Sequence, residues 1–347
     1  MTAAATGPPA PRRSSVRMGL AALALSLCVT LVILELALIV SGFSATPVDI
    51  QVGQTPDARA YHVFEDANFE YHPDLIWAPR AGTSIFNAQG FRGDEVTPVK
   101  PPGAIRVFTV GDSNTLGWAG ADGVHWPGEL QTFARQMHPA VTVVNAGVWG
   151  YASYQGLRRF RQTLAFDPDV VLISFGSNDA HWVTQPDRDY SAMSFRRTVL
   201  GQLMQKTRLG ELAISVIEGG SRPDATLVPR VSLDDFRANL TAMIGEARAR
   251  RVEIVLLTRP YVGSIPNAFW WKNRGADYSA ATAEIAAAEA VPMIDVYSFF
   301  KGRDELFADE SHFTDEGHRI AALIILDHLR PILARRGAPA PAGGITP

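Results

Sequence analysis

Cysteine is almost absent from this chain of 347 residues, which contains only Cys28. An internal disulfide, a Cys-x-x-Cys redox pair and a cysteine-rich zinc site are therefore excluded. An excess of positive charge is also missing, because 32 Lys and Arg stand against 35 Asp and Glu and leave a net charge of −3. A strongly basic nucleic-acid-binding protein is thus not expected. The hydrophobic content of 47%, by contrast, is typical of a folded chain rather than a disordered one.

Long apolar runs are confined to residues 20–40, which read LAALALSLCVTLVILELALIV. At 1.5 Å per residue this segment spans a hydrocarbon layer of about 30 Å. Three arginines precede it, whereas the ten residues after it contain no Lys or Arg. The asymmetry predicts a single-pass anchor at 18–41, with residues 1–17 in the cytoplasm and the remaining chain periplasmic or extracellular. A cleaved signal peptide is the alternative, although its apolar core is normally about 7–15 residues and no good Ala-x-Ala site follows this segment.

One carboxylate, Glu35, lies inside the apolar segment. A charge at mid-bilayer is costly, but Glu35 is closer to the outer end, where it is tolerable; a partner helix is the alternative interpretation. Residues 1–45 hold three arginines and this one glutamate, so the exported remainder carries a net charge of −5. A mildly acidic domain without disulfides fits a bacterial envelope better than a heavily bridged secreted module.

The exported part changes in character at about residue 104. Residues 42–103 show no clear periodicity and are predicted to form a linker and an extended lead-in. Short runs rich in β-branched residues follow, as is typical of strands buried on both faces of a parallel sheet. The predicted strands are residues 105–110, 141–145, 170–175, 252–257 and 291–296.

Helix-like stretches at 153–164, 233–251 and 278–290 lie between these strands. The alternation predicts a doubly wound α/β domain over residues 104–335. Residues 184–230 interrupt this alternation of strands and helices, and we expect them to be an insertion that could shape the entrance to the substrate site. Residues 336–347 are expected to be a flexible tail.

Small polar residues follow the predicted strands, in the blocks GDSNT (111–115), NAG (145–147), GSND (176–179) and DESH (309–312). Ligands bind at the carboxyl ends of the strands in an open parallel sheet, so these loops should converge. A serine hydroxyl is a weak nucleophile until a base takes its proton, and the base needs an orienting carboxylate. Ser113, His312 and Asp309 offer these three groups.

Three hydrogen-bond donors could stabilise negative charge beside the serine. At a strand-to-helix turn the N–H of Ser113 is free, Gly147 can offer an N–H that no side chain blocks, and Asn178 can offer its amide. Such donors form an oxyanion hole, in which each is worth about 3 kcal/mol of the barrier. We expect the neighbouring Asp112 and Asp179 to hold loops rather than to react.

Together the four blocks resemble the SGNH, or GDSL-type, serine hydrolases, in order and in spacing, over about residues 105–330. The resemblance implies a flavodoxin-like fold and ester chemistry, with Ser113 as nucleophile, His312 as base and Asp309 as its orienter. It also implies an oxyanion hole built from Ser113, Gly147 and Asn178. Two positions differ, because Asn114 replaces the usual leucine and Phe313 a frequent proline, and neither position reacts. The lead-in sequence NAQGFRGDE is similar to a segment of membrane-anchored members.

Three tryptophans, Trp118, Trp149 and Trp182, lie within five residues of these blocks. Indoles beside an ester site can stack on sugar rings or hold an acyl chain, and packing of the loops is an equally good interpretation. They favour a carbohydrate or glycolipid ligand. Neither a metal nor another cofactor is expected, and His318 is expected to be structural.

The sequence therefore predicts a membrane-anchored serine esterase that acts on an ester-bearing small molecule, glycan or lipid, with an O-acetyl group on an envelope or extracellular glycan as the favoured substrate. An O-acyltransferase is the first alternative, because a sugar hydroxyl can replace water at the same acyl-serine. A multi-pass membrane acyltransferase would then be its partner. A glycan-binding scaffold on an inactive hydrolase fold is the second alternative.

Overall fold

The computed structural model describes residues 13–43, 67–72, 74–118, 120, 123–183, 186–189, 199–204, 206–217, 228–262 and 275–337. These residues form two compact units, which we describe separately. One comprises 1–47 and 195–220, and the other comprises 48–194 and 221–347. The start of the predicted cytoplasmic terminus, most of the linker, part of the insertion and most of the predicted tail lie outside the described residues.

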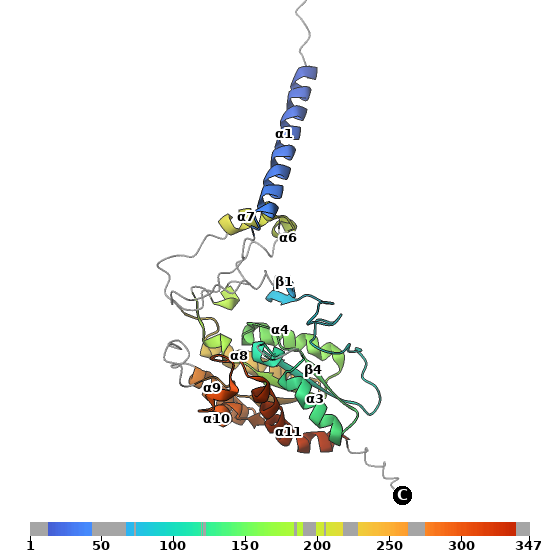
Figure 1. The fold of residues 1–347 in the computed structure, drawn as a ribbon, viewed down its shortest axis with the longest axis vertical. Helices are drawn as coiled ribbons and strands as arrows, with labels where there is room; N and C mark the ends of the chain where they lie inside the picture. The colour runs from blue at the N-terminus through green and yellow to red at the C-terminus, as the bar shows by residue number, and fades with distance from the viewer. Residues whose placement is uncertain are drawn as a thin grey trace, which may run out of the picture. The chain divides into compact units, whose positions relative to one another are not determined.

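Five parallel strands form the centre of the larger unit (Figure 1). They are β3 (Ile105–Gly111), β4 (Val141–Asn145), β5 (Val170–Ser174), β8 (Glu253–Leu257) and β9 (Met293–Ile294). Their order, β4-β3-β5-β8-β9, is the flavodoxin-like one and confirms the predicted fold class. Only β9 is much shorter than predicted, because Asp295 caps the next helix, α10 (Val296–Phe300), by accepting the N–H of Ser298.

Helices cover both faces of this sheet (Figure 1). The first core lies under α4 (Ser153–Thr163), α8 (Leu233–Ala249) and α9 (Gly275–Ala288), and the second lies under α3 (Trp126–Met137) and α11 (Asp315–Gly337). Successive β3 residues alternate between the two: Phe108 joins the first core and Val107 the second. The strand is therefore apolar on both sides, which explains the unbroken apolar runs in the sequence.

The lead-in belongs to the first core. β1 (Phe69–His72) and β2 (Ile76–Pro79) form an antiparallel hairpin, and its Trp77 is fully buried. Phe91 packs edge-on against Phe108 of β3, with ring centroids 5.3 Å apart. A short hairpin followed by turns has no long period, which is why the sequence showed only an extended segment here.

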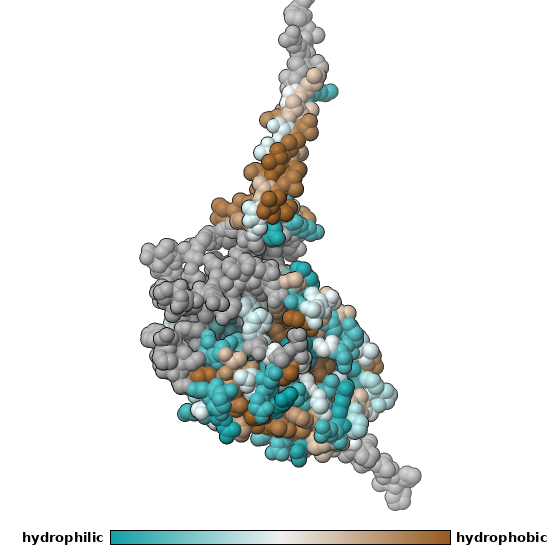
Figure 2. Space-filling model, viewed as in Figure 1, coloured by the Kyte–Doolittle hydropathy of each residue, from teal (hydrophilic) through white to brown (hydrophobic). Residues whose placement is uncertain are grey.

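The smaller unit contains α1 (Arg13–Val40), α6 (Val199–Met204) and α7 (Arg208–Ile217). Hydrophobic side chains cover α1 (Figure 2), and residues Arg17–Val40 are long and apolar enough to cross a membrane, a test that a signal sequence also passes. α6 and α7 come from the predicted insertion; α7 packs against α1, and α6 packs against α7. In the larger unit, β6 (Trp182–Val183) pairs with β7 (Val228–Pro229); these two strands lie at the start and the end of the insertion.

Candidate active site

The candidate nucleophile, Ser113, is the first residue of α2 (Ser113–Leu116), which begins directly after β3. Asp112 caps this helix, because its Oδ1 accepts the N–H of Asn114 at 2.9 Å. A first helical residue has no earlier turn to accept its own N–H, so the Ser113 N–H is left for a ligand. The tight turn requires Gly111, since a Cβ there would lie 2.1 Å from the Thr115 hydroxyl.

Ser113, His312 and Asp309 form one hydrogen-bonded line although 199 residues separate the serine from the histidine. Ser113 Oγ lies 2.7 Å from His312 Nε2, and His312 Nδ1 lies 2.7 Å from Asp309 Oδ2. Because the Nδ1–H of His312 donates a hydrogen bond to Asp309, Nε2 of the neutral ring is free to accept the serine proton. The three predicted residues are thus brought together in the order that general-base activation requires.

Asp309 also organises the loop that carries the histidine. Its Oδ1 accepts the backbone N–H groups of Ser311 at 2.9 Å and His312 at 2.8 Å. Burial raises the pKa of Asp309, but the hydrogen bond and charge of His312 and these two N–H groups outweigh it and lower the pKa to about 2. The carboxylate is therefore ionised whenever the histidine is needed as a base.

A buried ion pair joins the serine turn to the histidine loop. Asp112 Oδ2 accepts from Arg259 Nε at 2.8 Å, and both side chains are almost fully buried. Arg259 Nη1 also donates to the carbonyl oxygen of Ser311 at 3.0 Å, beside Asn114 Nδ2, which donates to the same oxygen at 3.2 Å. Ser311, the residue before His312, is thus held by both neighbours of the nucleophile: directly by Asn114, and by Asp112 through Arg259.

Sequence reasoning missed Arg259 and gave Asn114 no role. The available signal was an arginine directly after a buried strand, in LLTRP, at the sheet edge where ligands bind. A second missed residue is Arg92 of the lead-in, whose Nη1 donates to the carbonyl oxygen of Leu116 at the end of α2, 2.7 Å away. The lead-in therefore helps to hold the C-terminal end of α2, the helix that begins with Ser113.

Two of the three predicted oxyanion donors already donate within the protein. The Gly147 N–H donates to Asn145 Oδ1 at 2.9 Å, and Asn178 Nδ2 donates to the Tyr151 carbonyl oxygen at 2.9 Å. The Asn178 amide has a second hydrogen, which this bond leaves available. Glycine at 147 is also needed for packing, because a Cβ there would lie 2.4 Å from the Leu116 nitrogen.

Asp179 and His318 occupy structural positions, as expected. Asp179 accepts the N–H groups of Ser153 and Gly176 and thereby joins the start of α4 to the loop after β5. Burial raises its pKa to about 6 against the lowering effect of these hydrogen bonds. His318 is fully buried in α11, and its Nδ1 accepts the N–H of Trp126 at 3.2 Å.

The three predicted substrate-binding tryptophans do not share one arrangement. Trp118 and Trp149 lie side by side, with ring centroids 5.9 Å apart, and Trp118 is 39% exposed directly after the nucleophile helix. Trp149 is partly buried, and its carbonyl oxygen accepts from the indole N–H of Trp77. Trp182 lies in β6, paired with Pro229.

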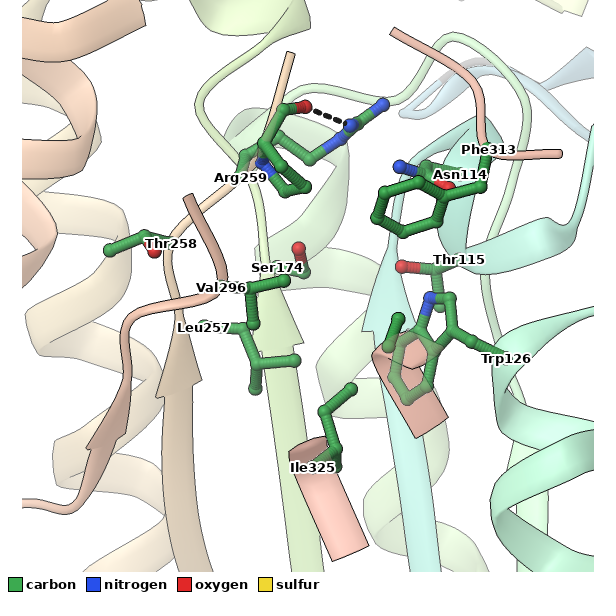
Figure 3. A pocket seen from close by; sticks show the side chains of 12 residues that line it. Asn114, Thr115, Trp126, Ser174, Leu257, Thr258, Arg259, Val296, Phe313 and Ile325 are labelled. Atoms are coloured by element: carbon green, nitrogen blue, oxygen red, sulfur yellow. Dashed lines mark hydrogen bonds between the residues drawn. The ribbon is translucent and has the colours of Figure 1, made fainter. Parts of the chain in front are cut away.

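A small cavity lies between Thr115 of α2, Leu257 of β8 and Ile325 of α11 (Figure 3). Asn114, Thr115, Ser174 and Arg259 contribute its polar lining, and the Thr115 hydroxyl points into it. Neither Ser113 nor His312 lines this cavity, so an ester held there could not reach the nucleophile. Across the described residues, no group of three or more His, Cys, Asp or Glu side chains is placed to hold a metal ion.

Comparison with known proteins agrees with this geometry. Residues 109–320 match the GDSL-like Lipase/Acylhydrolase family, which covers more than half of the chain. A comparison with curated proteins finds no match.

Several solved structures are similar. The lipase/acylhydrolase from Enterococcus faecalis has 24% sequence identity and a TM-score of 0.45, and the match covers 66% of this chain and 96% of that one. The acetylxylan esterase Axe2 from Geobacillus stearothermophilus has 20% identity and a TM-score of 0.46, with 67% and 97% covered. A putative lipolytic protein of the G-D-S-L family from Desulfitobacterium hafniense DCB-2 has 17% identity and a TM-score of 0.44, with 65% and 99% covered.

The family match spans the strand that leads into Ser113, the Gly147 and Asn178 loops and the histidine loop as far as the first turns of α11. A hydrogen-bonded Ser-His-Asp line in that context is the arrangement that acyl transfer requires. The chain therefore belongs to the GDSL-like lipase/acylhydrolase family and is a carboxylic ester hydrolase.

Proposed function

We propose that this protein is a serine esterase, held at a membrane by α1, that removes O-acetyl groups from an envelope or extracellular glycan. The observation that carries the catalytic part is the continuous hydrogen-bonded line from Ser113 Oγ through His312 to Asp309.

The first half of the reaction forms an acyl-enzyme. His312 Nε2 takes the proton of Ser113 Oγ as the oxygen attacks the ester carbonyl, and Asp309 stabilises the imidazolium that results. The tetrahedral intermediate then expels the sugar oxygen, which receives the proton from His312. In the second half His312 deprotonates a water molecule, which attacks the acyl-Ser113 ester. The bond from the acyl carbon to Ser113 Oγ then breaks, Oγ takes the proton back from His312, and acetate is released.

The developing oxyanion is stabilised by the Ser113 N–H and the second amide hydrogen of Asn178. Neither hydrogen is committed by the geometry described above. Gly147 would contribute only by sharing its N–H between the substrate and Asn145 Oδ1. We therefore assign Gly147 the smallest share of the oxyanion stabilisation.

A glycan is favoured by the tryptophans beside the nucleophile. Trp118 presents an exposed indole next to Trp149, five residues after Ser113. A flat apolar ring of this kind can stack on the apolar face of a sugar while the attached ester reaches the serine. The membrane location is favoured by the 24-residue span Arg17–Val40 and by the charge asymmetry on its two sides.

The catalytic assignment is tested with the full chain purified in detergent. Wild type should hydrolyse p-nitrophenyl acetate and take up a fluorophosphonate label. Ser113→Ala should do neither, whereas Ser84→Ala, which changes an exposed serine in the lead-in, should do both. Equal turnover by Ser113→Ala would show that Ser113 is not the nucleophile, and an unlabelled wild type would favour a scaffold.

The substrate is tested by acetate release from O-acetylated peptidoglycan fragments and acetylated xylo-oligosaccharides, compared with p-nitrophenyl esters of longer acids. Preference for a long-chain ester over every glycan would overturn the glycan proposal. Adding an unacetylated glycan with an acyl donor identifies a transferase, because acylated product then appears in the mass spectrum. The serine assignment would survive either result.

A further inference from the structure

The smaller unit pairs the one carboxylate of the apolar helix with the start of another helix. Glu35 Oε1 accepts the backbone N–H of Arg208 at 2.8 Å, and Oε2 accepts that of Leu209 at 2.8 Å. These are the first two residues of α7, whose N–H groups have no acceptor within their own helix. The carboxylate also faces the positive end of the α7 dipole, so it is bound by hydrogen bonds and by charge.

This contact explains why a carboxylate is tolerated in an otherwise apolar span. Without this contact Glu35 would face hydrocarbon, which disfavours an ionised group. Charged residues within membrane-spanning helices are therefore rare, and those that occur usually have a partner. Among residues 17–40 of this helix, Glu35 and Leu38 are half-buried and the others are exposed. α7 thus covers one side of α1 at the level of Glu35.

The position of Glu35 along the helix sets the depth of that contact. It lies 18 residues after Arg17, or about 27 Å along the axis at 1.5 Å per residue. With Arg17 at the inner surface, Glu35 lies close to the outer boundary of a hydrocarbon layer of about 30 Å. The α7 N-terminus is then at the outer interface rather than in mid-bilayer.

The hairpin has the surface that an interfacial element needs. Leu200, Leu203 and Val216 expose between 57% and 73% of their surface although all three are apolar. Lys206 and Arg208 lie in and beside the turn between the helices and supply the charge that headgroups attract. The turn is compact, because the Thr207 hydroxyl accepts the N–H of Gly210 at 3.0 Å.

We propose that the α6–α7 hairpin is a second membrane-binding element, which lies in the outer leaflet interface and is locked to the anchor helix by Glu35. The exposed apolar side chains of the hairpin contact lipid. This inference rests on the membrane anchoring proposed above.

The test uses the full chain with an environment-sensitive fluorophore on one cysteine, in phosphatidylcholine–phosphatidylglycerol vesicles. Wild type carries the label at Cys28, and a Cys28→Ala background carries it through Leu203→Cys, Val216→Cys or Val99→Cys. Val99 is an 81% exposed residue of the larger unit and is the control. Doxyl groups on the lipid chains quench labels in lipid, and iodide quenches labels in water.

We expect doxyl lipid to quench the labels at 28, 203 and 216 at least threefold more strongly than the label at 99. If the label at 28 is quenched and those at 203 and 216 respond only to iodide, the hairpin proposal is wrong and the anchoring stands. If the label at 28 itself responds only to iodide, the anchoring is wrong and the hairpin proposal falls with it.

The lock is tested by Glu35→Ala in the Leu203→Cys background. Doxyl quenching at 203 should fall at least twofold, whereas Thr30→Ala, on the same helix, should leave it unchanged. A separate Glu35→Ala chain that keeps Cys28, labelled there, reports whether this variant still spans the bilayer, and hydrolysis of p-nitrophenyl acetate reports whether the catalytic unit is folded. Unchanged quenching at 203 in a chain that passes both controls would overturn the lock.

Discussion

Two histidines six residues apart show how differently neighbouring regions of one chain use the same side chain. His312, in the loop before α11, is 14% exposed and lies between a serine hydroxyl and a carboxylate. His318, in the first turns of α11, is fully buried and packs edge-on against Phe313, with ring centroids 5.5 Å apart. The first can exchange protons with a ligand, and the second cannot reach one.

The surroundings of His318 keep its ring neutral. Burial is the main cause of its lowered pKa, the positive charge of Arg92 adds to it, and together they bring the pKa to about 3. His125, which caps α3, has its pKa lowered to about 3 by burial and by the same arginine. A histidine in this core is therefore a neutral hydrogen-bond acceptor, whereas the histidine of the loop is placed between Ser113 and Asp309, as the proposed base requires.

The largest effect expected from this difference is on catalysis at His312. His312→Ala removes the acceptor of the Ser113 proton, so kcat/KM for p-nitrophenyl acetate should fall about 10⁴-fold. His328→Ala, at an exposed position further along α11, should change it less than twofold. A loss below tenfold for His312→Ala would show that another group activates the serine.

Asp309→Asn should have the next largest effect. The amide cannot stabilise the imidazolium, and it favours the wrong tautomer, so we expect kcat to fall about 10³-fold. Asp327→Asn, a change at an exposed carboxylate of α11, is the matched control. If KM rises while kcat stays constant, Asp309 serves substrate binding instead.

Arg259→Met should affect stability and catalysis together. Removing one partner of a buried ion pair leaves Asp112 uncompensated, which lowers the free energy of unfolding by about 3 kcal/mol. It also leaves the Ser311 carbonyl oxygen with Asn114 as its one remaining donor of the two described above, so kcat should fall more than in a variant that is only less stable. Asp112→Asn combined with Arg259→Met should recover part of the stability in urea unfolding. A double variant less stable than the single one would contradict the pairing.

His318→Asn should have the smallest effect on activity, and its distinctive effect should be on how stability depends on pH. The unfolded chain binds a proton on His318 near pH 6.5 and the folded chain does so only near pH 3, so wild-type stability falls as the pH drops between these values. Between pH 7.5 and pH 5 this histidine accounts for a loss of about 2 kcal/mol. The asparagine oxygen can still accept the Trp126 N–H but does not titrate, so that loss should disappear. If the free energy of unfolding in urea depends on pH in the same way in wild type and in His318→Asn, the His318 ring is not kept neutral by burial.

Much of the fold could be predicted, because it is written in local patterns. β4 coincides with its predicted range, and β3, β5 and β8 differ by one residue at one end. The Ser232 hydroxyl caps α8 by accepting the N–H of Asp235, as a serine before an apolar-periodic stretch indicates. The predicted triad residues could be named because each follows a predicted strand in a short polar block.

The long-range hydrogen bonds that hold the site in place could not be predicted. Arg259 reaches Asp112 across 147 residues and Arg92 reaches Leu116 across 24. Arg259 has only its place after a buried strand as a local signal, and nothing local distinguishes Arg92 from a surface arginine. The bond from the Gly147 N–H to Asn145 is local, but which way that N–H points depends on the turn that packs against α2.

The sequence by itself determined the order of strands and helices, the apolar span and the residue types at the site, because each of these depends on residues close together in the chain. Only the tertiary structure decided that His312 meets Ser113 while His318 is buried, and that Glu35 meets α7 173 residues away. Burial and hydrogen bonding set the charge and the availability of a polar group, and both depend on segments that are distant in sequence and adjacent only after folding.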